Sequence, residues 1–218
     1  MKIAIDGPAG AGKSTIARLL ARKTGYIYID TGAMYRALTW KALQNNININ
    51  SGEDLERLAR ETKIEFQYSL EDQKTICDGR DVSQEIRSPE VNAAVSVVAA
   101  YSGIRSIMVK LQQQMARNHS VVMDGRDIGE CVLPDADYKF YLTASIEERA
   151  RRRQKELLAS GYDAEYDDIK NEIVARDLND ASREVGALKV LPDSIVIDTS
   201  ECHVGEVLDK MLEIMKGT

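Results

Sequence analysis

"GPAGAGKST", residues 7–15, lies between an apolar run that begins after Lys2 and a stretch with the spacing of a helix. Its glycines let the backbone turn N–H groups inward at little steric cost, and Lys13 adds a positive charge. A strand before and a helix after are the context that G-x-x-x-x-G-K-[ST] requires of a phosphate-binding loop. The segment therefore predicts a parallel α/β fold with a nucleoside-triphosphate site. A glycine-rich turn that binds nothing is the alternative.

Each part of this loop has an expected role. Backbone N–H groups at the helix start would bind the β-phosphate, and Lys13 would reach the β- and γ-phosphate oxygens. The Ser14 hydroxyl would ligate Mg²⁺, together with Asp124, which closes an apolar strand as metal-organising carboxylates do in phosphate-loop proteins. The residues expected to bind ATP are Gly7, Pro8, Ala9, Gly10, Ala11, Gly12, Lys13, Ser14 and Thr15.

Composition narrows the class of protein. The chain has 218 residues, of which 44% are hydrophobic and 29% charged, as is ordinary for a globular protein with one main core. Its apolar runs stay well short of the roughly 20 residues that span a bilayer, and its start does not resemble a signal peptide. The net charge of −6 argues against nucleic-acid and membrane-surface binding. Three cysteines without C-x-x-C spacing suit a reducing compartment, so we expect a cytoplasmic protein.

Alternating strands and helices begin the chain and resume after residue 106, which predicts a parallel sheet with an insertion. We expect a core at 1–35 and 107–218, an inserted domain at 36–106 and a lid at about 153–166. Expected strands are Lys2–Asp6, 26–30, 63–69, 74–78 (around a polar turn at 71–73), 121–124, 139–142 and Ile195–Asp198. Expected helices are Lys13–Thr24, 33–43, two stretches after Pro89, one from a capping box at Ser145–Glu148, 165–180, and a last one with the core-facing stripe Val204, Val207, Leu208, Met211, Leu212 and Met215.

Six further motifs accompany the loop, in order along the chain. They are "DTGAMYRALTW" (30–40), "DGRDVSQEIR" (78–87), "NAAVSVVAAYSGIR" (92–105), "DGRDIG" (124–129), "ASIEERARRR" (144–153) and "ARDLNDASR" (175–183). Together they resemble the bacterial cytidylate kinases, a branch of the nucleoside monophosphate kinase family, from Ile3 to about Pro192. Many relatives have glycine where this chain has Ser14, and the serine strengthens the Mg²⁺ assignment.

The resemblance implies a three-layer α/β P-loop core with a five-stranded parallel sheet, an inserted monophosphate-binding domain and a short lid. It also implies transfer of the γ-phosphate of ATP to CMP or dCMP with Mg²⁺, so the expected partners are these small molecules. A two-substrate cleft that closes around its own lid needs no second subunit, and we expect a monomer. A phosphate monoester is largely deprotonated at pH 7, so this reaction needs charge stabilisation and alignment rather than a general base. The residues implied as catalytic are Lys13, Arg126, Arg149, Arg153 and Arg183.

The same resemblance implies which residues bind the acceptor nucleotide, CMP. Thr31 and Arg36 would hold the CMP phosphate with Arg126 nearby, Ser96, Arg105 and Asp127 would read the base, and Arg176 and Asp180 would contact the sugar. Gly125 completes the set of substrate-binding residues. Asp127 suits the base, because cytosine offers an exocyclic amine to a carboxylate, whereas uracil would turn a carbonyl toward it.

Each assignment has an ordinary structural alternative. Arg36 can be a surface arginine beside a helix cap, and Asp127 can pair with Arg126. Arg176, Asp180 and Arg183 at i, i+4 and i+7 can form a solvated ion-paired helix face, as can Arg149, Arg152 and Arg153. "DGRD" at 78–81 is interpreted as a turn without chemistry.

Two other functions fit the loop. An alcohol kinase on the same fold would need a general base, for which Asp30 and Asp124 are candidates. A nucleotide-dependent switch or adaptor would retain its product tightly and act through a partner protein. The guanine-reading motif N-K-x-D is absent from the sequence.

Overall fold

The computed structural model describes residues 1–68, 73–159 and 161–217. Two compact units make up the chain. Unit 1 contains Met1–Ile27 and His119–Thr218, and unit 2 contains Tyr28–Asn118. Ser160 of the expected lid and residues 69–72, which include most of the expected polar turn, lie outside the described residues. The assignment of 36–106 to monophosphate binding and of 153–166 to a lid stays a prediction.

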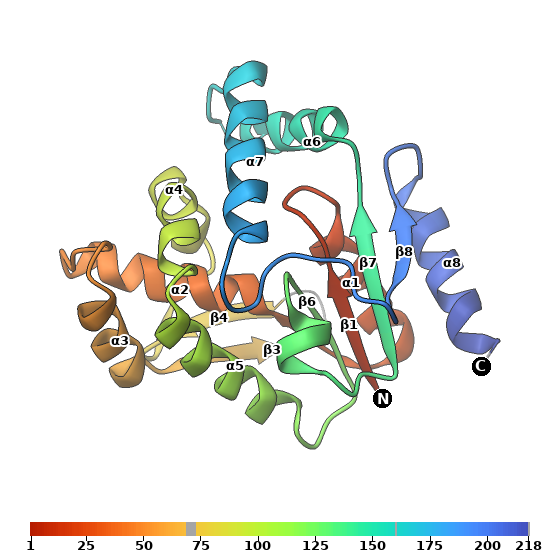
Figure 1. Ribbon diagram of the computed structural model, residues 1–218, viewed down its shortest axis with the longest axis horizontal. Helices are drawn as coiled ribbons and strands as arrows, with labels where there is room; N and C mark the ends of the chain where they lie inside the picture. The colour runs from red at the N-terminus through yellow and green to blue at the C-terminus, as the bar shows by residue number, and fades with distance from the viewer. Residues whose placement is uncertain (69–72, 160, 218) are drawn as a thin grey trace. The chain divides into compact units, whose positions relative to one another are not determined.

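A five-stranded sheet with the strand order β2-β6-β1-β7-β8 confirms the predicted architecture (Figure 1). Parallel pairs join β1 to β6, β1 to β7 and β7 to β8. All of β6 is buried, as expected for a strand covered on both faces. The strands are β1 (Lys2–Asp6), β2 (Ile27–Asp30), β6 (Val121–Gly125), β7 (Tyr138–Thr143) and β8 (Ile195–Asp198).

The register of β1 and β6 places candidate functional residues at one end of this sheet. Ile5 of β1 lies opposite Asp124 of β6, and Asp6 lies opposite Gly125. Both strands therefore end at the same level, where the phosphate-binding loop follows β1 and the "DGRDIG" motif closes β6. Ligands of open α/β sheets bind outside these carboxyl ends.

The helices of unit 1 are α1 (Lys13–Thr24), the one-turn π-helix η2 (Ile128–Val132), α6 (Ile146–Ala159), α7 (Tyr166–Ala181) and α8 (Val204–Lys216). In α8, which packs against α1, Val207, Leu208 and Met211 are buried, but Val204 is 46% exposed. The predicted stripe is wrong at that position, because Val204 begins the helix and burial starts one turn later.

Only half of the predicted capping box forms at α6. The Glu148 N–H donates to Ser145 Oγ at 3.2 Å, as the box requires, whereas the Ser145 N–H donates to Ser200 Oγ at 2.9 Å. Ser200 lies just beyond β8, so the start of α6 is tied to the end of a strand distant in sequence.

Unit 2 has its own core and a small antiparallel sheet, β3-β4-β5. Met34, Leu38, Leu55, Ile104 and Met108 are fully buried in that core. The elements are α2 (Thr31–Gln44), α3 (Gly52–Glu61), β3 (Ile64–Tyr68), β4 (Gln73–Cys77), β5 (Arg80–Asp81), η1 (Glu85–Arg87), α4 (Pro89–Val98) and α5 (Ser102–Ala116).

Two details of unit 2 bear on the sequence analysis. The turn expected at 78–81 is confirmed, because Asp78 and Gly79 have φ values of 48° and 82°. Helix α3 was not predicted. It begins at Gly52, after the N-cap residue Ser51, whose hydroxyl accepts from the Asp54 N–H, and it buries Leu55 and Leu58 against the core.

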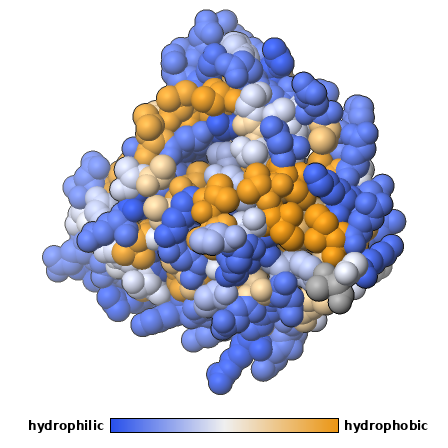
Figure 2. Space-filling model, turned by 45° about the vertical axis from the view of Figure 1, so that its right-hand side comes forward, coloured by the Kyte–Doolittle hydropathy of each residue, from blue (hydrophilic) through white to orange (hydrophobic). Residues whose placement is uncertain are grey.

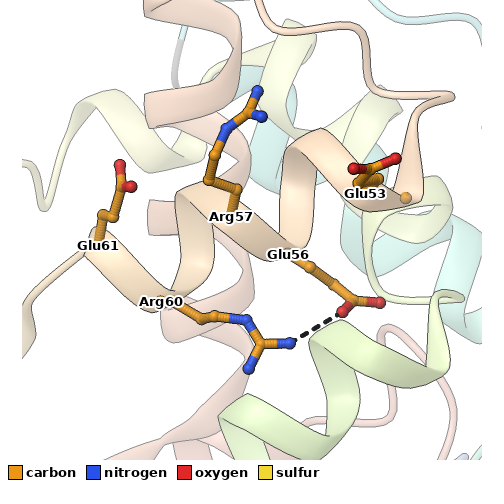
Figure 3. A pocket seen from close by; sticks show the side chains of 6 residues that line it. Glu53, Glu56, Arg57, Arg60 and Glu61 are labelled. Atoms are coloured by element: carbon orange, nitrogen blue, oxygen red, sulfur yellow. Dashed lines mark hydrogen bonds and ion pairs between the residues drawn. The ribbon is translucent and has the colours of Figure 1, made fainter.

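A charged hollow lies along α3 (Figure 3). Glu56 and Arg60 turn toward each other and pair at 3.1 Å, and Arg57 pairs with Asp54. Such exposed pairs three and four residues apart contribute little energy and are common on helix surfaces. We assign this hollow no role.

The outer surface is largely charged or polar on the face seen in Figure 2, with hydrophobic residues gathered in separate areas. No single helix in the described residues is long and apolar enough to cross a membrane. Helices α4 and α5 pass the length and composition criterion only as a pair, and they bend by 102° at their junction.

Candidate nucleotide-binding site

The phosphate-binding loop owes its path to glycine. Gly7 has φ 146°, and a Cβ added there would lie 1.9 Å from the Leu142 carbonyl oxygen of β7, so a side chain cannot fit. Gly12 has φ 83° and precedes the first residue of α1. The main chain therefore curves into a cradle at a helix N-terminus, the arrangement that binds phosphate. These features fit the triphosphate of ATP.

Lys13 lies within this cradle. Its side chain is almost fully buried, and Nζ donates to the Pro8 carbonyl oxygen at 2.7 Å. Burial lowers the pKa of Lys13 well below its ordinary value, the positive charge of Arg126 lowers it further, and Asp124 partly opposes both. The Pro8 carbonyl is a neutral partner for this ammonium group. A phosphate oxygen in its place would be a negatively charged one.

Ser14 and Asp124, the two residues predicted to bind metal, lie together. Ser14 Oγ donates to Asp124 Oδ2 at 2.7 Å, and Asp124 is 4% exposed. A hydroxyl and a carboxylate are hard oxygen ligands of the kind that Mg²⁺ prefers, and Mg²⁺ commonly binds one or two such groups plus water and phosphate. The described residues contain no cluster of three or more His, Cys, Asp or Glu that could hold a metal by itself. This pair fits magnesium held jointly with a bound phosphate.

Asp180 forms ion pairs with two of the arginines predicted as site residues, Arg126 and Arg183. Its carboxylate accepts from Arg126 Nε at 2.7 Å and from Arg183, and it is 1% exposed. Burial by itself would raise the pKa of Asp180, but Arg126 and Arg183 outweigh burial and hold the pKa below its ordinary value. The ion pairs of Asp180 with Arg126 and Arg183 are thus largely buried, which contradicts the alternative of a solvated ion-paired face.

The predicted helix face is wrong for Arg183. Helix α7 ends at Ala181, so Arg183 lies in the segment that follows and reaches back to Asp180. Arg176 and Asp180 do lie on α7, and the charge of Arg176 acts on both Asp180 and Lys13. The helix expected at 165–180 already ended before Arg183, so the i+7 helical spacing did not apply to this residue.

Arg149 supports the phosphate-binding loop from α6. Its guanidinium donates to the Ala144 and Ala9 carbonyl oxygens, both at 3.1 Å, and to Asp177 of α7 at 2.6 Å. The side chain is 4% exposed. Arg149 therefore braces the loop through Ala9, and its direct contact with ATP stays a prediction.

The other cations of α6 pair with neighbouring carboxylates. Arg152 lies 3.0 Å from Glu148, and Arg153 lies 2.9 Å from Glu156. Arg152 also donates to Thr199 just after β8. These pairs agree with the alternative of a charged helix face, and the catalytic role of Arg153 stays a prediction.

In unit 2, Thr31 and Arg36 lie at the start of α2. Thr31 is buried, and Asp30 before it caps the helix by accepting from the Ala33 N–H at 2.8 Å. Arg36 pairs with Asp30 at 3.0 Å and its side chain is 19% exposed. The structure confirms the helix cap and contradicts the interpretation of Arg36 as a plain surface arginine.

The two base-reading candidates of unit 2 come from neighbouring helices. Arg105 on α5 is 2% exposed, donates to the Ala99 carbonyl oxygen at 3.2 Å and lies over the Tyr35 ring. The half-buried Ser96 hydroxyl on α4 has no hydrogen-bond partner among the described residues. A guanidinium held in place and an uncommitted hydroxyl are both suited to donate to a pyrimidine ring.

Comparison with known proteins identifies the family. The family description "Cytidylate kinase" matches residues 3–217. The chain belongs to the cytidylate kinase family. A cytidylate kinase of Desulfitobacterium hafniense is 49% identical over 214 residues, covering 98% of this chain and 92% of the relative. A cytidylate kinase of Bacillus velezensis is 49% identical over 216 residues, covering 99% and 96%. The match extends beyond Pro192, the end of the resemblance stated in the sequence analysis.

Solved structures support the fold of this cytidylate kinase family member. Shikimate kinase from Acinetobacter baumannii has a TM-score of 0.51 and 14% identity, covering 99% of this chain and 93% of its own. An uncharacterised protein from Eubacterium ventriosum has a TM-score of 0.52 and 12% identity, covering 100% and 99%. At these identities the likeness concerns the fold alone.

Three residues around the loop were not singled out from the sequence. Asp177 pairs with Arg149, Thr199 donates to the Ala11 carbonyl oxygen at 3.2 Å, and Asp6 binds main-chain N–H groups after β6. Asp6 ends β1 and Thr199 follows β8. The rule that parallel strands end at a common edge could have found them.

Proposed function

We propose that the chain transfers the γ-phosphoryl group of ATP to CMP or dCMP, giving ADP and CDP or dCDP, in pyrimidine nucleotide metabolism. The observation that carries the proposal is the family match across residues 3–217, on a chain whose phosphate-binding loop is intact. The cradle after β1 and Lys13 within it provide the triphosphate site.

The chain's own part in the reaction is charge and alignment. Lys13 would exchange the Pro8 carbonyl for phosphate oxygens, and Arg126 and Arg183 would offset the repulsion between donor and acceptor phosphates. Ser14 and Asp124 would hold Mg²⁺, which when bound supplies further positive charge at the β- and γ-oxygens. Arg149 and Arg153 would add charge from α6. The acceptor phosphate needs no general base, because its second pKa is near 6.

Acceptor recognition follows the family pattern. We infer that Thr31 and Arg36 bind the CMP phosphate and that Arg176 and Asp180 bind the sugar. For the base we infer Ser96, Arg105 and Asp127, with Gly125 in the adjoining main chain. The buried carboxylate of Asp127 suits an amine donor, which cytosine has and uracil lacks at the corresponding position.

The alcohol-kinase alternative is less well supported by the candidate bases. Asp30 is engaged by the Ala33 N–H and by Arg36, and Asp124 accepts from Ser14. A general base must be within hydrogen-bond reach of its acceptor hydroxyl, and both carboxylates already have structural partners.

A panel of acceptors tests the function. The protein would be assayed for ADP formation with CMP, dCMP, UMP, AMP, GMP, shikimate and gluconate, each with ATP and magnesium. We expect CMP and dCMP to be phosphorylated fastest, since only cytosine presents an amine to Asp127 among the pyrimidines offered. Phosphorylation of an alcohol but not of CMP would contradict the proposal, and ATP turnover that CMP does not stimulate would favour a switch.

Replacement of Ser14 by alanine tests the metal assignment. Ser14→Ala removes the hydroxyl that pairs with Asp124 and would bind magnesium, so we expect kcat to fall by about tenfold or more, with a higher magnesium concentration needed for half-maximal rate. Steady-state rates over a magnesium titration measure this. Thr24→Ala is a matched control, because the Thr24 hydroxyl at the other end of α1 donates only to helix carbonyls. An unchanged magnesium requirement in Ser14→Ala would refute the assignment.

We also propose that the protein is a cytoplasmic monomer whose partners are nucleotides. Among the described residues, Cys77, Cys131 and Cys202 form no disulfide bond, which supports a reducing compartment. The net charge of −6 supports the absence of nucleic-acid and membrane partners. Light scattering of the purified protein would measure its mass, and a dimer would contradict the proposed monomer.

A further inference from the structure

Asp6 joins two segments that are distant in sequence. It is the last residue of β1, directly before Gly7, and is 6% exposed. Its Oδ1 accepts from the Ile128 N–H and its Oδ2 from the Gly129 N–H, both at 2.8 Å. One carboxylate thus uses both oxygens to bind the main chain that follows β6.

The bound main chain is the beginning of η2. A single π-turn is a rare element that forms few hydrogen bonds of its own, and the first N–H groups of any helical turn have no partner within it. Asp6 supplies the partner. Asp127 immediately precedes this turn, and its carbonyl oxygen accepts from the Cys131 N–H at 2.8 Å. The anchor at Asp6 therefore fixes where Arg126 and Asp127 leave the strand.

We propose that Asp6 is a positioning residue for the acceptor nucleotide, acting through the main chain of Ile128 and Gly129 to set Arg126 and Asp127. This inference rests on the proposed function, which gives Arg126 and Asp127 their contacts with CMP. In this role Asp6 acts through the main chain and not by contact with CMP. The role requires a carboxylate, because both of its oxygens accept, whereas an amide of the same shape would turn a donor toward one of the two N–H groups.

Electrostatics argues that Asp6 does not serve stability alone. The pKa of Asp6 is raised to about 6, mainly by burial. The negative charge of Asp127 also raises this pKa, whereas the hydrogen bonds from the two N–H groups and the charge of Lys13 lower it. The charge of Asp6 also acts on the Tyr141 phenol of β7. Because the pKa of Asp6 in the folded protein lies above the ordinary value of 3.8, ionisation of Asp6 reduces folding stability as pH rises from 3.8 to about 6. A neutral residue would avoid this cost, but it would not hold both N–H groups.

Asp6→Asn is the direct test. We expect kcat/KM for CMP to fall by about ten- to a hundredfold, mainly through KM, while the affinity for ATP measured by calorimetry changes by less than about threefold. Asp137→Asn is the matched control, because Asp137 Oδ2 binds the Lys2 N–H at 2.6 Å at the opposite end of β1. That variant should keep wild-type values for both nucleotides.

The outcomes separate the possibilities. An unchanged KM for CMP in Asp6→Asn overturns the inference, and so does an equal loss for CMP and ATP, which a general loss of structure would give. A wild-type protein that does not phosphorylate CMP overturns the proposed function instead, and it would be recognised before any variant is compared.

A measurement on the wild-type protein serves if Asp6→Asn does not fold. In a pH titration followed by NMR, the Ile128 and Gly129 amide resonances should shift together with a midpoint near 6, as Asp6 gains its proton. The Lys2 amide, which faces Asp137, should not share this midpoint. Failure of the two resonances to titrate together overturns the inference.

Discussion

Lys13→Ala is expected to lower kcat with CMP by about a hundred- to a thousandfold while the protein remains folded. Lys13 provides the buried positive charge of the phosphate-binding loop, and charge directed at a transferring phosphoryl group acts mainly in the transition state. The same buried cation is costly to the folded protein, since burial and Arg126 both lower its pKa. We therefore expect Tm without added nucleotide to stay the same or rise.

Rates and thermal unfolding should be measured on the same preparations. Lys170→Ala is the control for loss of a lysine, because Lys170 forms an exposed ion pair with Glu147 on the surface of unit 1 and should leave kcat unchanged. Retained turnover in Lys13→Ala would contradict the charge-stabilising role. A large drop in Tm would instead assign Lys13 to the fold.

Asp127→Ala is expected to reduce selectivity for cytosine. The kcat/KM for CMP should fall by about ten- to a hundredfold, the effect of losing one well-placed base contact, while that for UMP changes by less than about threefold. In Asp127→Asn, whose amide can donate to a carbonyl, the preference should shift toward UMP. Competition between CMP and UMP in one reaction measures the ratio directly.

Glu130 offers a control on the same segment as Asp127. It lies in η2, is exposed and pairs with Lys189 at 2.6 Å, so Glu130→Ala removes a nearby negative charge without a proposed base contact. Its CMP-to-UMP ratio should equal that of the wild type. Equal losses for CMP and UMP in Asp127→Ala would remove Asp127 from base recognition.

The main sheet and its loop could be predicted because their signals are local. The β1 and α1 bounds agree with the expected ranges, since a buried apolar strand and a glycine before a helix mark the chain directly. Ser14 and Asp124 are 110 residues apart, yet the rule that parallel strands end at one edge anticipated their proximity.

Other features depend on tertiary contacts that local patterns do not contain. The contacts of Arg149 with Ala9 and Asp177 are of this kind, because the second requires α7 to lie beside α6. Arg183 holds Asp180 from beyond the helix end. Helix α3 escaped notice because its ten residues are mostly charged, and only a few apolar positions give it a buried face.

Pro8 gives the loop a property beyond shape. Proline has a fixed φ and no N–H, so the backbone has fewer conformations at this position, and the Pro8 carbonyl oxygen accepts from the Lys13 ammonium group. Lys13 would exchange this carbonyl for an incoming phosphate oxygen by rotation of its side chain. We expect the association rate of ATP to be governed by diffusion and charge attraction.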